Sequence, residues 1–239
     1  DNHPAVATSY SYIGQIYFAQ NDYSKALDYF KKSLNLDLSF FGENHPEVAS
    51  GYYNIGYVYF AQGDYSKALE YFEEVLKIRL SVYGENHSRV ASVYNDIGEI
   101  YSVQGDDFKA LDYFKKSLKI VLSVYGENHS QVSSIYDHIG EVYFAQKDYS
   151  KALYYFEESL KIRLSLFGEN HPEVALSYYS IGSLYIIQGD KSKALNYYEK
   201  SLKIRLSVYG ENHPLTKEIM DLINVAANSK VLQSPETTK

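Results

Sequence analysis

The chain contains no cysteine and no tryptophan. Without cysteine it can form neither a disulfide scaffold nor a thiolate zinc site, and it has no thiol nucleophile. Long apolar runs are also missing, because no stretch approaches the roughly 18 consecutive apolar residues of a membrane-spanning helix. The sequence shows no recognisable secretory signal, so we expect none. The sequence therefore predicts a cytoplasmic protein without a membrane partner.

Basic residues are scarce relative to acidic ones. The 239 residues include 23 Lys and Arg against 30 Asp and Glu, which gives a net charge of −7. This balance argues against non-specific attraction to nucleic acid, so we expect no nucleic-acid partner. An initiator methionine is also missing, and the chain starts inside a phrase that recurs later, Asp1-Asn-His-Pro4. We therefore expect a piece of a longer protein.

Repetition is the dominant feature of the sequence. The phrase Tyr83-Gly-Glu-Asn-His-Ser88 returns in closely similar form at a constant spacing of 42 residues, and only His138 lies off the histidine lattice. A period of this length indicates a repeat array rather than separate domains. The lattice histidines are His3, His45, His87, His129, His171 and His213. The predicted array covers 2–227, as repeats 2–43, 44–85, 86–127, 128–169 and 170–211 and a capping helix 212–227, before a disordered tail 228–239.

Each repeat predicts two helices. In the second repeat, apolar residues follow helical spacing from Val48 to Tyr59 and again from Leu69 to Tyr83. Gly63-Asp64 is typical of one helix ending and the next beginning, and Gly84 of a second helix end. Asn44 is the expected cap of the first helix, with Pro46 in the first turn and Glu47 completing a capping box. The predicted fold is all-α.

The repeated phrase places a histidine close to a glutamate, and these two residue types can bind a metal ion. Equivalent loops of stacked hairpins lie about 8–10 Å apart, the distance between packed helices. Zinc–nitrogen bonds are about 2 Å long, so histidines spaced in this way cannot share one metal ion. We therefore predict a local packing or hydrogen-bonding role for them, and neither a metal nor a cofactor.

The constant columns carry a family resemblance. Tyr52-x2-Ile55-Gly56-x2-Tyr59 followed by Ala68-x3-Phe72 resembles the tetratricopeptide signature. The proline that usually ends the second helix is missing, and the 42-residue unit is similar to the repeat of kinesin light chains. This resemblance implies a right-handed superhelical solenoid of five hairpins plus a capping helix, acting as a protein–protein interaction scaffold. Gly56 and Ala68 are the expected points of contact between the two helices.

The columns that vary are the informative ones for a ligand. In tetratricopeptide arrays the first helices line a concave groove, so the resemblance places the peptide-binding positions around each Ile-Gly pair. The candidates are Tyr12, Gln15, Tyr53, Asn54, Tyr57, Asn95, Asp96, Glu99, Asp137, His138, Glu141 and Tyr179. Exposed tyrosines at such positions supply rigid contact area and a hydroxyl group for peptide binding.

Acidic residues dominate these positions in the third and fourth repeats. Asp96, Glu99, Asp137 and Glu141 stand there without a basic residue among the candidate positions. We hypothesise a peptide partner that carries Lys or Arg, whereas kinesin light chains favour acidic peptides. The alternative is that these carboxylates only keep the surface soluble.

Catalysis is not expected. The pattern His45-Pro46-Glu47 matches part of a zinc deaminase motif, but that chemistry needs a later cysteine pair. His138 near Asp137 and Glu141 could be pictured as an acid–base group, although a lone histidine on a groove is far more often a ligand contact or a surface residue. A competing interpretation is a structural or self-associating spacer without a peptide ligand. The first repeat lacks a polar cover, so end-to-end association with another copy belongs to this interpretation.

Overall fold

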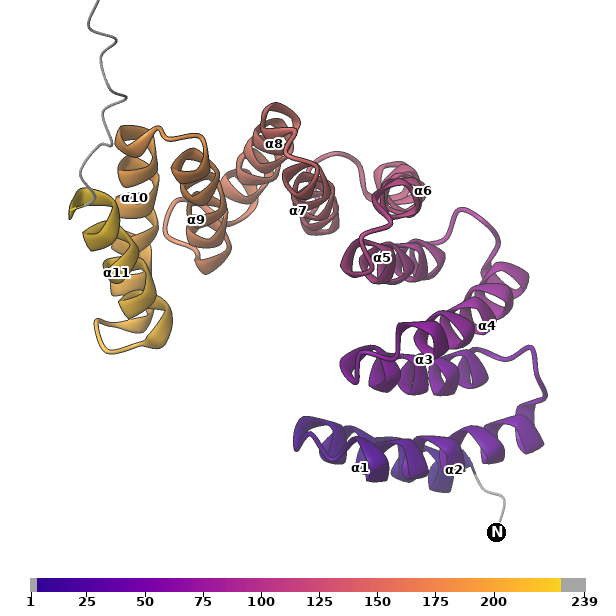
Figure 1. Cartoon of the computed structure of the whole chain (residues 1–239). Helices are drawn as coiled ribbons and strands as arrows, with labels where there is room; N and C mark the ends of the chain where they lie inside the picture. The colour runs from indigo at the N-terminus through magenta and orange to yellow at the C-terminus, as the bar shows by residue number, and fades with distance from the viewer. Residues whose placement is uncertain (1–3, 229–239) are drawn as a thin grey trace, which may run out of the picture. The chain divides into compact units, whose positions relative to one another are not determined.

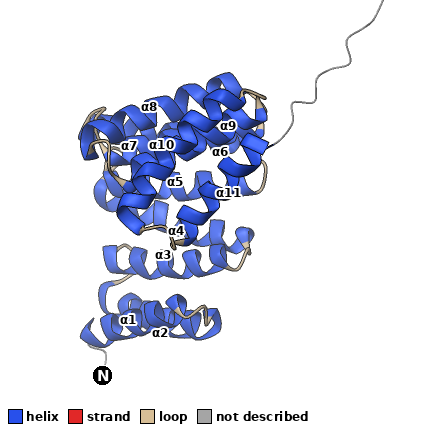
Figure 2. Ribbon diagram, turned by 90° about the vertical axis from the view of Figure 1, so that its left-hand side faces the viewer, coloured by secondary structure: helices blue, strands red, loops and turns tan. Residues whose placement is uncertain are grey.

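The computed structural model describes residues 4–228 of the chain. Within this range the backbone forms eleven α-helices joined by short loops (Figure 1) and no strand (Figure 2). The helices are α1 (Pro4–Ala19), α2 (Tyr23–Phe41), α3 (Pro46–Ala61), α4 (Tyr65–Tyr83), α5 (Ser88–Val103), α6 (Asp107–Tyr125), α7 (Ser130–Ala145), α8 (Tyr149–Phe167), α9 (Pro172–Ile187), α10 (Lys191–Tyr209) and α11 (Pro214–Asn228). The predicted all-α fold of five hairpins and a terminal helix is confirmed.

Every repeat has the same construction. A first helix of 16 residues is followed by a second helix of 19 residues, and the two pack against each other as a hairpin. The terminal helix α11 ends at Asn228, one residue later than predicted. Of the predicted tail 228–239, Asn228 belongs to α11, and residues 229–239 lie outside the described residues, as do Asn2 and His3 at the start of the first repeat.

The chain divides into two compact units. The first, Asp1–Gly126, contains α1 to α6, and the second, Glu127–Lys239, contains α7 to α11. Within the first unit α2 packs against α3 and α4 against α5. Within the second unit α8 packs against α9 and α10 against α11. Successive hairpins therefore stack inside each unit, as predicted, while a single array from 2 to 227 stays a prediction.

The constant columns form the core. Ile55, Ala68 and Phe72 are almost completely buried. Gly56 lies so close to the second helix that an added Cβ would be 3.1 Å from Cβ of Tyr71. The predicted contact at Gly56 and Ala68 is confirmed, and it explains why a helix tolerates a glycine that costs about 1 kcal/mol relative to alanine.

The ends of the second helices agree with the prediction. The side chain of Asp64 accepts a hydrogen bond of 3.3 Å from the backbone N–H of Lys67. Gly84 then ends α4 with a φ of +80°, a conformation that glycine adopts without strain. Asp and Gly therefore serve as the N-cap and the C-cap of this helix.

The predicted cap of the first helices is wrong. The N-cap of α3 is His45, whose Nδ1 accepts a hydrogen bond of 3.3 Å from the backbone N–H of Glu47. Asn44 lies one residue too early, because the extended backbone of His45 is directly followed by Pro46 at the first helical position. Glu47 is then the second helical residue rather than the third, so the capping box does not form.

The recurrent histidine also packs on an aromatic ring. In the loop before α5, the rings of His87 and Tyr83 stack with their centroids 4.5 Å apart. Nδ1 of His87 accepts a hydrogen bond of 3.1 Å from the backbone N–H of Arg89. A neutral imidazole offers one acceptor nitrogen, which is what a cap requires. The predicted local role of this histidine is confirmed.

Candidate functional site

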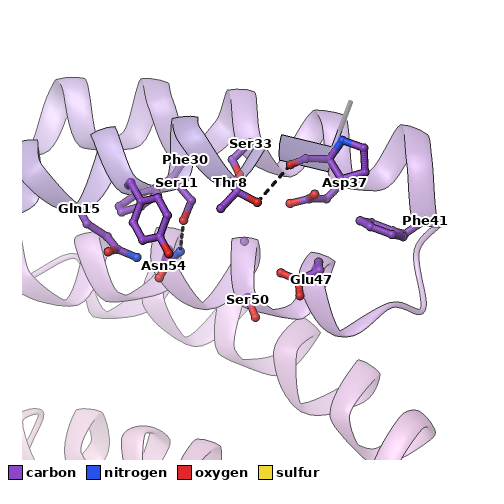
Figure 3. Close-up of a pocket in the computed structure, with 13 residues that line it drawn as sticks. Thr8, Ser11, Gln15, Phe30, Ser33, Asp37, Phe41, Glu47, Ser50 and Asn54 are labelled. Carbon is purple, nitrogen blue, oxygen red and sulfur yellow. Dashed lines mark hydrogen bonds between the residues drawn. The ribbon is translucent and has the colours of Figure 1, made fainter. Parts of the chain in front are cut away.

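A polar cavity of about 390 Å³ opens among α1, α2 and α3 of the first unit. Three of the predicted peptide-binding residues line it: Tyr12 and Gln15 from α1 and Asn54 from α3. Figure 3 shows Nδ2 of Asn54 donating a hydrogen bond of 3.3 Å to Oγ of Ser11. The register argument therefore brings these three residues to one hollow.

Exposed aromatic side chains stand on the same first helices. Tyr12 is 62% exposed and Tyr57 is 44% exposed. The ring of Tyr57 on α3 packs against that of Phe18 on α1, with the centroids 5.6 Å apart, and against that of Phe60. Aromatic side chains with one free face supply contact area at a low entropic cost. These two tyrosines match the expectation of exposed rings.

Tyr53 has a different environment. Its ring packs on that of Phe72, with the centroids 5.5 Å apart, and the guanidinium of Arg79 lies over it at 5.3 Å. Burial raises the pKa of the Tyr53 hydroxyl far above its usual range, and the nearby carboxylate of Asp96 raises it further. Tyr53 is therefore held by the fold and offers a partner only part of its surface.

The acidic residues of the third repeat are less charged than the sequence suggests. Oδ2 of Asp96 is buried and has no hydrogen-bond partner among the described residues. Burial, and then the neighbouring Glu99, raises the pKa of Asp96 to about 7. Burial also raises the pKa of Glu99. The side-chain amide of Asn95 donates a 2.6 Å hydrogen bond to Oε1 of Glu99, and this bond partly offsets the rise.

In the fourth repeat a basic side chain lies beside the predicted acidic position. Nη1 of Arg163 on α8 is 2.7 Å from Oδ2 of Asp137 on α7. The same guanidinium contacts Oε2 of Glu173 on α9 at 3.1 Å and donates a 2.8 Å hydrogen bond to Oγ of Ser177. The candidate positions themselves carry no basic residue, but a second helix supplies one. Asp137 is therefore already neutralised within the fold.

The remaining candidates of the second unit are His138, Glu141 and Tyr179. Burial, and then the charge of Arg163, lowers the pKa of His138 to about 4, so its imidazole is neutral near pH 7. Glu141 is exposed. The hydroxyl of Tyr179 donates a 3.2 Å hydrogen bond to Glu218 of α11, and Arg205 lies 5.0 Å from the centre of its ring.

One functional column escaped the sequence argument. A single position of the second helix, repeated every 42 residues, carries a charged residue in four of the five repeats. It comprises Asp37, Arg79, Val121, Arg163 and Arg205. The signal for it in the sequence is a change of charge at one position of the otherwise regular second helix.

The sequence profile described as tetratricopeptide repeat matches residues 1–39, 47–123, 89–165 and 132–207. These overlapping matches extend over most of the chain. The chain belongs to the tetratricopeptide repeat family. The family was predicted from the spacing of the constant columns, and that prediction is confirmed.

Solved structures show the same tetratricopeptide fold. BtubC (BKLC) from P. vanneervenii is 24% identical with a TM-score of 0.76, and the match covers 88% of this chain and 84% of that one. A putative kinesin light chain of Podospora anserina with nearly identical repeats is 16% identical with a TM-score of 0.72 and coverages of 87% and 98%. The apo form of RapI is 18% identical with a TM-score of 0.73, and the match covers 92% of this chain and 83% of that one. A search of curated proteins found no match.

Two further features concern residues 4–228 alone. No helix in this range is both long enough and apolar enough to cross a membrane. The same residues contain no cluster of three or more His, Cys, Asp or Glu side chains that could hold a metal ion.

Proposed function

We propose that the protein is a non-enzymatic interaction scaffold that binds a peptide segment of a partner along the first helices of its repeats. One observation carries the proposal: variable positions of α1 and α3, among them the exposed Tyr12, line a common polar cavity, and Tyr57 is also exposed on α3. Tetratricopeptide repeats typically serve protein interaction, which supports the same conclusion.

The partner segment carries basic residues in this proposal. Exposed Glu141 in the second unit, and Asp37 and Glu47 at the cavity of the first, supply negative charge near the candidate positions. Asp137 contributes less than its sequence position suggests, because Arg163 already balances its charge. Tyr53, Asn95 and Tyr179 act mainly by holding neighbouring side chains in place.

A peptide library displayed against the full chain tests the function directly. The affinity of the selected peptides is then measured by calorimetry for the Tyr57→Ser variant and for a matched control, Tyr154→Ser. Tyr154 is also an exposed tyrosine, at 58%, but it lies on the second helix α8. We expect about a tenfold loss for Tyr57→Ser, since a central aromatic contact is worth over 1 kcal/mol, and no loss for the control. Equal affinities for both variants would contradict a binding surface on the first helices.

The basic character of the partner has its own test. The combined variant Asp96→Asn, Glu99→Gln, Asp137→Asn and Glu141→Gln should weaken the binding of selected peptides rich in Lys or Arg. Because exposed charges are screened by salt, the wild-type affinity should also fall as ionic strength rises. Binding that responds neither to the four substitutions nor to salt would show that these carboxylates do not recognise the partner.

Self-association is the second candidate function. The first and the last helix each expose an apolar side chain, Ile16 at 57% and Val225 at 65%. Such residues would favour end-to-end contact between copies. Light scattering that shows growth of the particle with protein concentration, together with a peptide selection that yields nothing, would support this candidate. A cytoplasmic location stays a prediction.

A further inference from the structure

The column that begins at Asp37 has a defined structural role in other repeats. Arg163 is only 4% exposed and joins three helices: Asp137 of α7, its own helix α8, and Glu173 of α9. Arg205 occupies the equivalent place in the fifth repeat, where it donates a 2.6 Å hydrogen bond to the carbonyl oxygen of Leu215. A guanidinium group thus fills the space between two consecutive first helices.

Arg79 has the same role in the second repeat. Its Nη1 donates hydrogen bonds of 2.8 Å to the carbonyl oxygen of Arg89 and 3.0 Å to Oγ of Ser92, both on α5. On the other side the ring of Tyr53 from α3 covers the guanidinium. In the first and second units alike, the arginine therefore bridges the first helix of its own hairpin and that of the next.

The first repeat has this space but no arginine to fill it. Asp37 stands at the arginine position, Ser11 replaces the larger residue that covers the guanidinium, and Gly51 replaces Ser177. All three residues line the cavity of about 390 Å³, together with Glu47, the counterpart of Glu173. The cavity therefore corresponds to the space that Arg163 fills in the fourth repeat, but no arginine of this repeat fills it.

The acidic side chains at this cavity would be stabilised by a cation. Asp37 is 8% exposed and points into the cavity (Figure 3), and no basic side chain of the described residues forms an ion pair with it. Burial, and then the charge of Glu47, raises the pKa of Asp37, which His45 and Ser33 partly offset. A buried carboxyl group is stabilised by an opposite charge or a hydrogen-bond donor brought next to it.

We propose that the cavity among α1, α2 and α3 binds the guanidinium group of an arginine side chain presented by the partner. Asp37 on α2 and Glu47 on α3 provide carboxylate oxygens at the cavity. Glu47 corresponds to Glu173, which contacts Arg163, whereas Asp37 stands at the arginine position itself. A planar guanidinium with five N–H donors suits two carboxylates and the surrounding hydroxyl groups, whereas an ammonium offers only a compact charge. This inference rests on the proposed function and names the chemistry of one partner residue.

The probe is the blocked peptide acetyl-Ala-Arg-Ala-amide, titrated into the full chain and followed by amide chemical shifts in NMR spectra. Two further peptides carry citrulline, the uncharged analogue of arginine, or lysine at the centre. We expect the arginine peptide to shift the amide signals of Thr8, Ser50 and Asn54 at the cavity. The citrulline and lysine peptides should bind at least about tenfold more weakly, because citrulline carries no charge and lysine lacks the planar set of N–H donors that can bond two carboxylates.

Three variants complete the experiment. Asp37→Asn keeps the size of the side chain and should weaken the arginine peptide about tenfold or more. Asp37→Arg supplies from within the arginine that the second, fourth and fifth repeats carry at this position, and it should abolish binding. The control Asp28→Arg makes the same change of charge at an exposed position of α2 and should bind like the wild type.

Unchanged binding by Asp37→Arg, equal binding of the arginine and citrulline peptides, or shifts confined to other helices would each overturn the proposal. So would a wild-type spectrum that the arginine peptide leaves unchanged. The proposed function is tested separately, because selected peptides that still depend on Tyr57 would leave it intact. A failure of both experiments would remove the function as well.

Discussion

Arg163 and Asp137 form a buried ion pair, with Nη1 of the arginine 2.7 Å from Oδ2 of the aspartate and side chains that are 5% and 18% exposed. The pair joins α8 to α7, and the contact of the same guanidinium with Glu173 extends it to α9. A residue that varies between repeats therefore links one hairpin to the next. Substitution of Arg163 should therefore weaken the stacking of the hairpins, whether or not a ligand is bound.

Removing the arginine should destabilise the protein strongly. In Arg163→Met the carboxylate of Asp137 stays buried without its partner, and losing one member of a buried pair typically costs about 3–5 kcal/mol. Urea unfolding followed by circular dichroism measures the change in free energy. The double variant Arg163→Met, Asp137→Leu should recover part of it, since both charges of the pair are then absent. Lys77→Met breaks the exposed pair with Glu74 and should cost less than about 1 kcal/mol. A cost for Arg163→Met no larger than this control would contradict the prediction.

Asp96 should make stability depend on pH. Its pKa is raised to about 7 in the folded protein, from an ordinary value of 3.8. The folded state therefore favours the protonated carboxyl group. Its stabilising contribution is complete below a pH of about 4 and is lost as the pH rises through about 7. Each unit of pKa shift corresponds to about 1.36 kcal/mol, so Asp96→Asn should gain up to a few kcal/mol relative to wild type between pH of about 4 and 8.

Unfolding by urea at several pH values measures this difference. The titration of the Asp96 side-chain carbon signal by NMR gives the midpoint independently. A midpoint near the ordinary value for aspartate, or a difference between variant and wild type that is the same at both ends of the pH range, would show that Asp96 is not buried as described.

The spacing of apolar and small residues was sufficient to predict the hairpins, because the same residue types recur at the same positions in every repeat. Ile55, Ala68 and Phe72 occupy the predicted core, and Asp64 begins the predicted second helix. The cap at His45 was missed because a preference for asparagine at N-caps is only statistical. The actual cap depends on which residue takes the extended backbone conformation before Pro46.

The site was harder to predict than the fold. Register alone brought Tyr12, Gln15 and Asn54 to one cavity. It could not reveal that Arg163 reaches Asp137 from another helix, since this contact depends on side-chain length and on the packing between hairpins. Nor could it show that Tyr53 is held under Arg79 while Tyr57 stays exposed. Charge at a sequence position is thus a weak guide to charge on the surface.

Two glycines at equivalent positions should respond differently to alanine. A Cβ at Gly98 would lie 2.7 Å from ring atoms of Phe114, which is buried and cannot easily move. Overpacking in Gly98→Ala should cost about 1–3 kcal/mol, and the roughly 1 kcal/mol that alanine contributes to a helix offsets part of it, so we expect a net loss of up to about 2 kcal/mol. At Gly56 the nearest atoms are 3.1 and 3.2 Å away, so Gly56→Ala should be nearly neutral. Thermal or urea unfolding of both variants checks the order, and equal losses would contradict it.

The histidine of the repeated loop combines a cap with a stacked ring, and substitutions can separate the two contributions. His87→Ala removes the acceptor for the Arg89 N–H and the ring on Tyr83, so it should lose about 1 kcal/mol for the cap and about 0.5–1.5 for the stacking. His87→Asn keeps a capping oxygen and should lose mainly the stacking. Asn86→Ala, at the position that the sequence favoured as the cap, should cost little because Asn86 is exposed and lies outside the cap. If urea unfolding ranks Asn86→Ala as the more harmful change, the helix begins at the asparagine and the histidine is only a packing residue.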